Sequence, residues 1–526
     1  MRKAIWIILL CLLAGGGSAL YVWNTMKQSE HDEGEYSLYE TEKPQIELSL
    51  YFSVPDQARI RDESRDFVRK TIEEKFNVRL NVRYMAAGDN YDAQLTALLH
   101  ANNAPDMWIV RNSDGGSKHT LDGVLADMTA YISPLTMPRY FKYWETEREL
   151  IGYQIHNRFS RAPVPYDKND YRSYYIRKDW LDRLGLEVPA TYEQYLEVLR
   201  AFTFGDPDGN GHNDTYGFST SGNGTRLSAD WPEYIKNGLA YPAFMENNRF
   251  VDMESDPKIE EVVNDIVRVL DEGVIDPDWF LNKGNQHIEK AVRGEVGIVL
   301  GETADFAMDA NPQSLQSRSK AFHSEANWIP FSPFGNKPLR TGIDPGYPFV
   351  FAKATADNEP EKLVRLVEVL DWLVGEEGFL LTHYGLEGKH YVREGNSIAL
   401  LDEEQEREIR QTGDFRSVWS FLTPELPNVF GLQVVNARLT DHDRQVKEYL
   451  AGMPAEEKLG TALTPPIGID EGLFRAKQNE FQVKMLFSEK SGRNWPIYRA
   501  QIMHEYYGEQ ILRNFESQVR KARKSS

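Results

Sequence analysis

Residues 206–217 are the stretch of this sequence whose composition and spacing point most directly to chemistry. They read Asp-Pro-Asp-Gly-Asn-Gly-His-Asn-Asp-Thr-Tyr-Gly, and every second position can offer an oxygen ligand: Asp206, Asp208, Asn210, His212 through its backbone carbonyl, and Asp214. This is the spacing with which a tight loop wraps Ca²⁺, and Gly211 stands at the sixth position, where the turn needs a free backbone. We therefore predict a calcium site here.

The loop departs from an EF-hand at its twelfth position, which is Gly217 instead of a bidentate glutamate, and the sequence does not supply the flanking helix pair. A calcium loop of EF type on a different scaffold is the reading we favour. The alternative is a polar double turn, because Asp-Pro-Asp-Gly and Asn-Gly form turns on their own. Turn formation does not, however, require carboxyl or amide oxygens at alternating positions.

Composition limits the class of protein. At 526 residues the chain is too long for one core and predicts two or more domains, and 41% hydrophobic residues are ample for burial. A formal charge of −20 argues against a nucleic-acid binder, which needs clustered Lys and Arg. The lone cysteine, Cys11, lies in the N-terminal apolar run, so the rest of the chain can form neither a disulfide nor a thiolate metal cluster.

The block from residue 174 to residue 217, YYIRKDWLDRLGLEVPATYEQYLEVLRAFTFGDPDGNGHNDTYG, resembles the family 1 extracellular solute-binding proteins of ABC importers. Within that family it is most similar to the large subgroup for oligosaccharides, which includes alginate-binding and lipoprotein-type members, and the match continues more weakly along nearly the whole chain. The resemblance implies an α/β protein of the two-lobed periplasmic-binding-protein type II fold, with a hinge, an interlobe cleft and no enzymatic activity. It also implies a structural Ca²⁺ beside the second lobe, away from the cleft. In the family a carboxylate often follows the ninth-position Asp, and here that place is Thr215, which leaves the last ligand open.

The N-terminus predicts a location outside the cytoplasm. Residues 1–3 carry positive charge, and residues 4–23 are an uncharged, largely apolar run. Residues 1–26 are either a signal peptide, cleaved after Ala19, or a retained membrane anchor, and Tyr21 and Trp23 favour the anchor. Lipidation at Cys11 is a third reading, disfavoured because the residue before the cysteine is leucine and not a small residue.

Alternating strands and helices predict the domain organisation. Strands are expected at residues 46–52, 78–82, 105–110 and 296–301, and helices at residues 61–76, 91–100, 260–270, 360–374 and within 495–519. Such alternation predicts parallel sheets with α/β layering. We expect a flexible tether at 27–44, the first lobe at 45–165, the second at 166–330 with the calcium loop at 206–215, a return to the first lobe at 331–415, and the second lobe with C-terminal helices at 416–526.

Sugar recognition needs aromatic platforms for the C–H face of the ring and planar polar groups for its hydroxyls. The loop after the strand at 105–110 falls where ligands bind in parallel sheets, and the resemblance gives the matching loop, and the one at 302–306, a part in the sugar site. Arg111 is the best candidate for a charged sugar, because guanidinium pairs with a carboxylate through two hydrogen bonds; a pair within the lobe is the alternative. The predicted ligand-binding residues are Arg111, Asn112, Asp114, Trp231, Phe306, Tyr347 and Trp419.

Two catalytic motifs begin in this sequence but are not completed. Gly217-Phe218-Ser219 does not continue into a nucleophile elbow, and His504-Glu505 lacks the second histidine of a zinc protease, because residue 508 is glycine. We expect an extracytoplasmic, monomeric binding protein that delivers an oligosaccharide, acidic or neutral, to the permease subunits of an ABC importer by interlobe closure. The alternatives are an anchored polysaccharide hydrolase or lyase, since paired carboxylates cannot be tested in sequence, and a ligand-capturing sensory adaptor.

Overall fold

A computed structural model describes residues 43–525, with gaps at 55–62, 87–88, 112–115, 151–153, 156–157, 170, 335–338, 342–347, 436–438 and 462. The predictions for residues 1–26, Cys11 included, and for most of the tether therefore lie outside the described residues. Within the described part, none of the helices combines the length and apolar character that crossing a membrane requires.

The chain forms two compact units. The first comprises the described residues up to 166 and those between 345 and 435, and the second comprises the described residues between 167 and 344 and those after 435. Our second and third boundaries, at 331 and 416, were placed too early. The strand β9 (Trp328–Phe331) belongs to the sheet of the second unit, and the helix α17 (Phe415–Trp419) packs into the core of the first.

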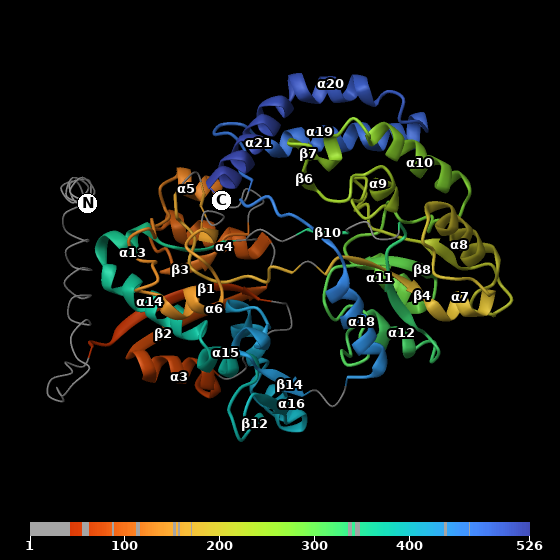
Figure 1. Cartoon of the computed structure of the whole chain (residues 1–526). Helices are drawn as coiled ribbons and strands as arrows, with labels where there is room; N and C mark the ends of the chain where they lie inside the picture. The colour runs from red at the N-terminus through yellow and green to blue at the C-terminus, as the bar shows by residue number, and fades with distance from the viewer. Residues whose placement is uncertain are drawn as a thin grey trace. The chain divides into compact units, whose positions relative to one another are not determined.

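The first unit is an α/β unit (Figure 1). Its elements are β1 (Ile46–Val54), η1 (Glu63–Arg65), α3 (Phe67–Phe76), β2 (Val78–Ala86), α4 (Asp89–His100), β3 (Met107–Ile109), α5 (Ser117–Leu121), α6 (Pro138–Tyr143), β11 (Phe349–Phe351), α13 (Lys353–Asn358), α14 (Pro360–Leu373), α15 (Glu376–His383), β12 (Tyr391–Glu394), β13 (Ser397–Leu400), α16 (Asp402–Thr412), α17, η4 (Ser420–Leu422), η5 (Pro427–Phe430) and β14 (Gln433–Val435).

Its main sheet has the order β11-β3-β1-β2. β1 runs parallel to both β2 and β3, and β11 is antiparallel. Alternating apolar residues of β1, such as Leu48 and Phe52, are buried in the larger core cluster, and Tyr51 lies in a second one, so the sheet is covered on both faces. The predicted parallel α/β layering is confirmed: Ser53 lies near the carboxyl end of β1, and Arg111 follows that of β3.

The second unit contains β4 (Ser173–Arg177), α7 (Lys178–Leu184), α8 (Tyr192–Phe204), β5 (Tyr216–Phe218), α9 (Pro232–Lys236), β6 (Ala243–Glu246), β7 (Arg249–Asp252), η3 (Met253–Ser255), α10 (Ile259–Asp271), α11 (Gln286–Arg293), β8 (Val296–Gly301), α12 (Leu315–Lys320), β9, β10 (Arg340–Thr341), α18 (Asp441–Gly452), β15 (Ala455–Glu456), α19 (Glu471–Lys484), the π-helix η6 (Met485–Glu489), α20 (Trp495–Glu505) and α21 (Gly508–Ser525).

The sheet of this unit has the order β5-β8-β4-β9. β5 and β8 are parallel, and β4 is antiparallel to β8 and to β9, so the carboxyl ends of β5, β8 and β9 share one edge with the start of β4. β8 is buried along its whole length, as expected for a strand covered on both faces. The helix α8 begins with a capping box between Thr191 and Gln194 and packs on this sheet through Leu199 and Phe202.

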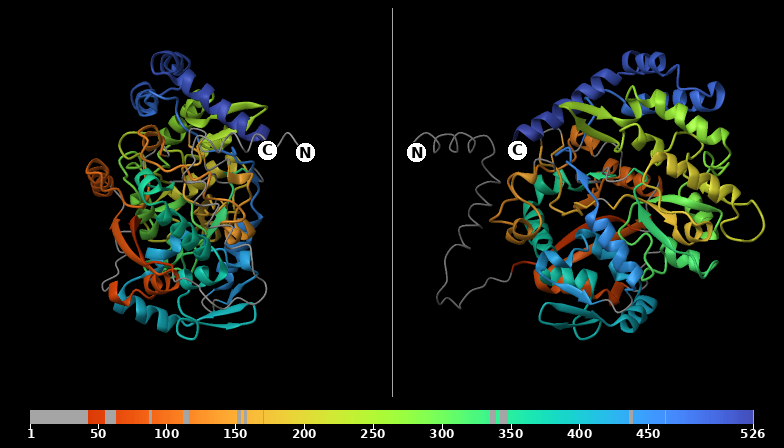
Figure 2. Two further views of the ribbon diagram at one scale, coloured as in Figure 1. Left: turned by 90° about the vertical axis from the view of Figure 1, so that its left-hand side faces the viewer. Right: turned by 45° about the vertical axis from the view of Figure 1, so that its right-hand side comes forward.

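The C-terminal helices α19, α20 and α21 form a layer beside α10 and β7 (Figure 1), and Figure 2 shows the same layer from two further sides. A bidentate ion pair attaches this layer: the guanidinium of Arg475 in α19 donates to both carboxylate oxygens of Asp252 at 2.9 and 2.6 Å. Trp495 at the start of α20 donates its indole N–H to the carbonyl of Asp256 at 2.8 Å. The helices α19, α20 and α21 are thus part of the second unit and contribute Phe474, Trp495 and Phe515 to its core.

Candidate calcium loop and ligand-binding faces

The predicted calcium loop folds its acidic side chains around the side-chain amide of Asn210. The amide nitrogen donates to Asp208 Oδ2 at 2.9 Å and to the two carboxylate oxygens of Asp214 at 3.1 and 3.2 Å. The carboxylate of Asp206 accepts from the backbone N–H groups of Asn210 and Gly211, each at 3.0 Å. Gly211 has φ of +81°, which confirms the turn expected at the sixth position.

The charges of this loop are crowded. Partial burial and, after it, the neighbouring carboxylates of Asp206 and Asp214 raise the pKa of Asp208. Asp206 itself adopts a left-handed conformation, with φ of +50°, and the carbonyl of Pro207 accepts a hydrogen bond from Arg183 Nη1 at 2.8 Å. Two carboxylates gathered on one partly positive N–H₂ group, with a third on the adjacent backbone N–H groups, form the kind of donor set that a hard cation would suit better than an amide does.

The structure explains why this loop lacks the twelfth-position glutamate. Gly217 lies in β5, and a Cβ atom there would stand 2.5 Å from Leu199 Cδ2 of α8, so no side chain fits. Thr215 is buried and donates its hydroxyl to the carbonyl of Phe202 at 2.6 Å, so this hydroxyl points away from the loop's oxygens. Neither residue supplies a further ligand from its side chain.

Within the described residues, no group of three or more His, Cys, Asp or Glu side chains is arranged to hold a metal by itself. The loop differs from such a group because Asn210 and the backbone at His212 would have to contribute. The amide oxygen of Asn210 accepts from the His212 N–H at 2.7 Å, so a half-turn of the amide would exchange nitrogen for oxygen at the centre of the carboxylates. The calcium site stays a prediction, and its donor chemistry fits.

In the first unit, Arg111 lies at a strand end, as expected. Its Nη1 donates to the hydroxyl of Ser53 at 3.2 Å, and its side chain is half-buried. Asn112, Asp114 and Tyr347, which sequence reasoning also assigned to the ligand, lie outside the described residues. A guanidinium next to a hydroxyl at the carboxyl ends of β1 and β3 could bind polar groups of a sugar.

Two predicted aromatic platforms are buried. Trp231 is 0% exposed and packs edge-on to Trp279 with ring centroids 4.9 Å apart; Trp419 is 1% exposed and donates its indole N–H to Asp66 Oδ2 at 2.9 Å. Neither indole offers a free face, so the prediction that they stack on a sugar is wrong for this structure. Phe306 is partly buried and lies 4.9 Å from the ring of Tyr175, and its ligand role stays a prediction.

Sequence reasoning missed a polar cluster at the carboxyl end of β5. Ser219 donates to Asp276 Oδ2 at 2.6 Å, and Asn282 donates to the same oxygen at 2.9 Å. Burial favours the neutral form of Asp276, but hydrogen bonds from Lys290, Ser219 and Asn282 outweigh it and lower its pKa. The signal in the sequence was the run of small polar residues directly after a buried strand.

The same cluster continues through the next residues to Asp230. Thr220 Oγ1 lies 2.7 Å from Ser228 Oγ and 2.9 Å from Asp230 Oδ2. Asp230 is partly exposed, whereas its neighbour Trp231 is buried. Asp230 lies in a turn just before α9, and its side chain reaches the Thr220 hydroxyl while the neighbouring indole packs inside.

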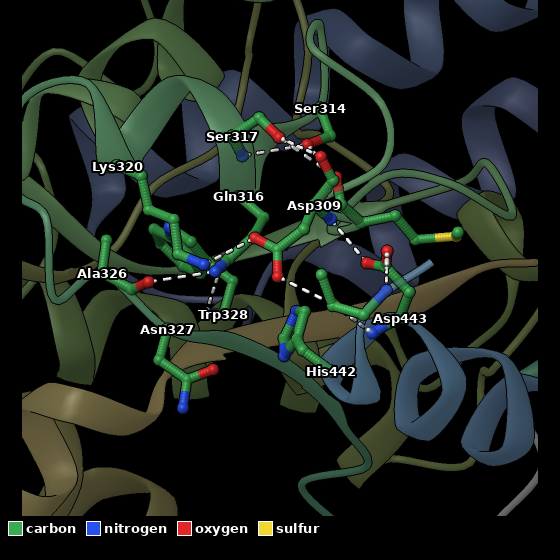
Figure 3. A network of polar contacts seen from close by, with 12 residues as sticks. Asp309, Ser314, Gln316, Ser317, Lys320, Ala326, Asn327, Trp328, His442 and Asp443 are labelled. Carbon is green, nitrogen blue, oxygen red and sulfur yellow. Dashed lines mark hydrogen bonds and ion pairs between the residues drawn. The ribbon is translucent and has the colours of Figure 1, made fainter. Parts of the chain in front are cut away.

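A second polar network holds the loop after β8, which includes Phe306 (Figure 3). The buried carboxylate of Asp443, near the start of α18, accepts the N–H groups of Asp309 and Ala310 at 2.5 and 3.1 Å. Asp309 in turn accepts from Lys320 Nζ at 2.6 Å and from Thr440 Oγ1 at 3.0 Å. The helix α18 thus fixes the loop after β8, which contains the predicted ligand contact Phe306.

Known proteins resemble this chain in sequence. No family model matches the chain. It is 24% identical over 340 residues, or 62% of this chain and 64% of the other, to the polygalacturonan/rhamnogalacturonan-binding protein YtcQ of Bacillus subtilis (strain 168). It is 34% identical over 134 residues, or 24% of each chain, to the fructooligosaccharide ABC transporter substrate-binding protein FusA of Streptococcus pneumoniae. The chain thus spans less than two thirds of the length of these relatives.

Solved structures match over more of the chain. An extracellular solute-binding protein from Bifidobacterium longum subsp. infantis superposes with a TM-score of 0.68 at 13% identity, covering 92% of this chain and 100% of the other. The fold is that of a two-lobed solute-binding protein. The alginate-binding protein AlgQ2, solved without calcium ion, superposes with a TM-score of 0.63 at 15% identity, covering 92% of this chain and 100% of the other.

An EF-hand mutant of FusA is a further structural neighbour, with a TM-score of 0.63 at 14% identity, covering 91% of this chain and 100% of the other. Loops of EF type therefore occur on this fold, as the spacing of residues 206–214 predicts. In open α/β sheets, ligands bind beyond the carboxyl ends of the strands, where Arg111 lies in one unit and Asp230 in the other.

Proposed function

We propose that the protein is an extracytoplasmic solute-binding protein that captures an oligosaccharide and delivers it to an ABC importer. The observation that carries the proposal is the similarity over 340 residues to a protein named for binding two pectic polysaccharides, in a chain with the solute-binding fold. The relatives are named for binding and not for catalysis, which supports a protein that leaves its ligand intact.

The strand-end clusters support a polar, hydroxyl-rich ligand. Arg111 and Ser53 in the first unit, and Thr220 and Asp230 in the second, offer donors and acceptors held by partly buried hydrogen bonds. Preorganised groups of this kind bind hydroxyls without a large ordering cost. The closing of the two lobes on ligand stays a prediction, which small-angle X-ray scattering with and without ligand would test.

Calcium would serve this function by stabilising one unit. The ion would be held by the side chains of Asp206, Asp208, Asn210 and Asp214 and by the carbonyl of His212. It would supply positive charge to a loop that joins α8 to β5, and so hold the amino end of β5, opposite the end that Ser219 and Thr220 follow.

A thermal-shift screen of the purified chain against neutral and acidic oligosaccharides tests the proposal. We expect at least one oligosaccharide to raise the melting temperature and to be recovered chemically unchanged. Products of cleavage would support the hydrolase or lyase alternative instead. The absence of binding to every member of a broad pectic, alginate and fructan panel would contradict the proposal.

A further inference from the structure

Asp230 presents a free carboxylate oxygen at the edge of the second unit's sheet. Its Oδ2 accepts from Thr220 Oγ1 at 2.9 Å, whereas Oδ1 has no protein hydrogen-bond partner among the residues that the structure describes. The residues around it are buried: Thr220 and Trp231 are fully so, and Ser228 nearly so. Asp230 is therefore the accessible end of an otherwise internal polar cluster.

The backbone that carries Asp230 is held from two sides. Tyr174 in β4 donates its hydroxyl to the carbonyl of Asp230 at 2.7 Å. Arg172, just before β4, donates to the carbonyls of Ala229 and Ala240, each at 3.1 Å. Tyr174 is a buried residue of the sheet and Arg172 is partly buried beside it, so the position of the carboxylate is set before any ligand arrives.

No Lys or Arg among the described residues lies within ion-pair distance of this carboxylate. In the described part of the chain, Asp230 forms no ion pair with Lys or Arg, and Arg172 is directed to carbonyl oxygens instead. Burial lowers the pKa of the nearby His287 imidazole and outweighs the opposite effect of the Asp230 charge. A ligand group at this place meets a carboxylate that no described Lys or Arg side chain pairs with directly.

An ionised carboxylate only accepts hydrogen bonds, and it binds hydroxyl donors well. A sugar carboxylate at the same place would have no proton to donate and would be repelled by the like charge. Building on the proposed function, we propose that Asp230 is a ligand-binding and specificity-determining residue, which accepts hydrogen bonds from the hydroxyls of an uncharged sugar ring and excludes a uronate from that subsite.

The test measures the affinity of the full chain for three probes by calorimetry: kestose, which is neutral; trigalacturonate, in which every ring is acidic; and a rhamnogalacturonan oligomer, in which uncharged and acidic rings alternate. The variants are Asp230→Ala and Asp230→Asn. The matched control is Asp271→Asn, which alters an exposed carboxylate at the end of α10 that pairs with Lys490.

We expect wild type to bind kestose or the alternating oligomer, and Asp230→Ala to weaken that binding by about 10- to 100-fold, as for loss of hydrogen bonds to a charged group. Asp230→Asn should bind trigalacturonate more tightly than wild type does, because the repulsion is gone, whereas Asp271→Asn should leave all affinities unchanged. Equal melting temperatures would show that the variants fold.

Two outcomes would overturn the inference while leaving the proposed function standing. One is that Asp230→Ala keeps its affinity for the neutral-ring probes within a factor of two. The other is that wild type prefers trigalacturonate and Asp230→Asn does not improve its binding. If wild type binds none of the probes, nor any member of the wider panel, the proposed function fails, and this inference fails with it.

Discussion

The side-chain nitrogen of Asn210 donates to both carboxylate oxygens of Asp214, at 3.1 and 3.2 Å. The same nitrogen also donates to Asp208, so it lies between the carboxylates of two aspartates. An amide N–H₂ carries only a partial positive charge, so it offsets little of the repulsion between these carboxylates. A divalent ion at that centre would lower the free energy of the loop much more.

We predict that removing calcium lowers the melting temperature of the protein. A ligand present at one hundred times its dissociation constant stabilises a fold by about 2.7 kcal/mol, so calorimetry in excess Ca²⁺ and in EDTA should differ by several degrees. The lower transition should come from the second unit, which contains the loop. Sugar affinity should change little, because the expected role of the ion is structural.

A loop variant provides the control for this prediction. Asp208→Asn removes one carboxylate without changing the size of the side chain, and its melting temperature should respond less to EDTA than that of wild type. Identical melting temperatures of wild type in calcium and in EDTA would leave the loop as a polar double turn, the alternative that the sequence also allows.

The sequence predicted elements better than it predicted which side chains meet a ligand. Hydrophobic periodicity located β8 and α14, because each buries a regular apolar pattern. It misplaced Trp231 and Trp419, because loop aromatics look alike in sequence whether they are packed inside or open to solvent. Only the fold shows that Trp231 packs on Trp279 while Asp230, the residue before it, remains accessible.

Long-range polar contacts were equally hidden from sequence reasoning. The carboxylate of Asp443 binds backbone groups of Asp309 and Ala310, which are more than 130 positions earlier in the chain. Neither hydrophobic periodicity nor a local motif indicates a contact between residues so far apart in the chain. For the same reason the third boundary between the units was placed too early, since nothing local in residues 416–435 shows that they pack with the first unit.

We predict that the stability of the protein depends on the protonation of Glu233. This glutamate is buried in α9, accepts from the Tyr192 hydroxyl at 2.8 Å, and has a pKa that burial raises to about 7, from 4.5. Between these two values the folded chain keeps a proton that the unfolded chain has lost, so stability falls as pH rises through this window. The upper limit of the fall is about 3 kcal/mol.

Urea unfolding at pH 5 and at pH 7.5 measures this effect. Glu233→Gln is neutral at both values and should remove this part of the pH dependence, while Glu197→Gln, at an exposed position of α8, should not. Because other groups also titrate, the informative quantity is the difference between wild type and Glu233→Gln. If that difference is the same at the two pH values, the prediction fails.

We predict that Asp443→Ala destabilises the second unit by about 2–4 kcal/mol. Asp443 is 0% exposed, and its carboxylate accepts from the N–H groups of Asp309, Ala310 and Thr440. Truncation leaves three N–H groups without their acceptor, which costs much more than loss of an exposed contact. Asp441→Ala, on the same helix with an 89% exposed side chain, is the control and should be nearly neutral in urea unfolding.

The last prediction concerns the attachment of the C-terminal helices. Arg475 in α19 forms the bidentate pair with Asp252, whose side chain is buried, so Arg475→Met should leave that carboxylate uncompensated and cost about 3–5 kcal/mol of unfolding free energy. The double variant Arg475→Met/Asp252→Asn should recover part of this loss, because it removes the orphaned charge. Arg513→Met breaks only an exposed pair with Glu509 and should change stability by less than about 1 kcal/mol. Strictly additive losses in the double variant would show that the pair does not attach the helices through charge.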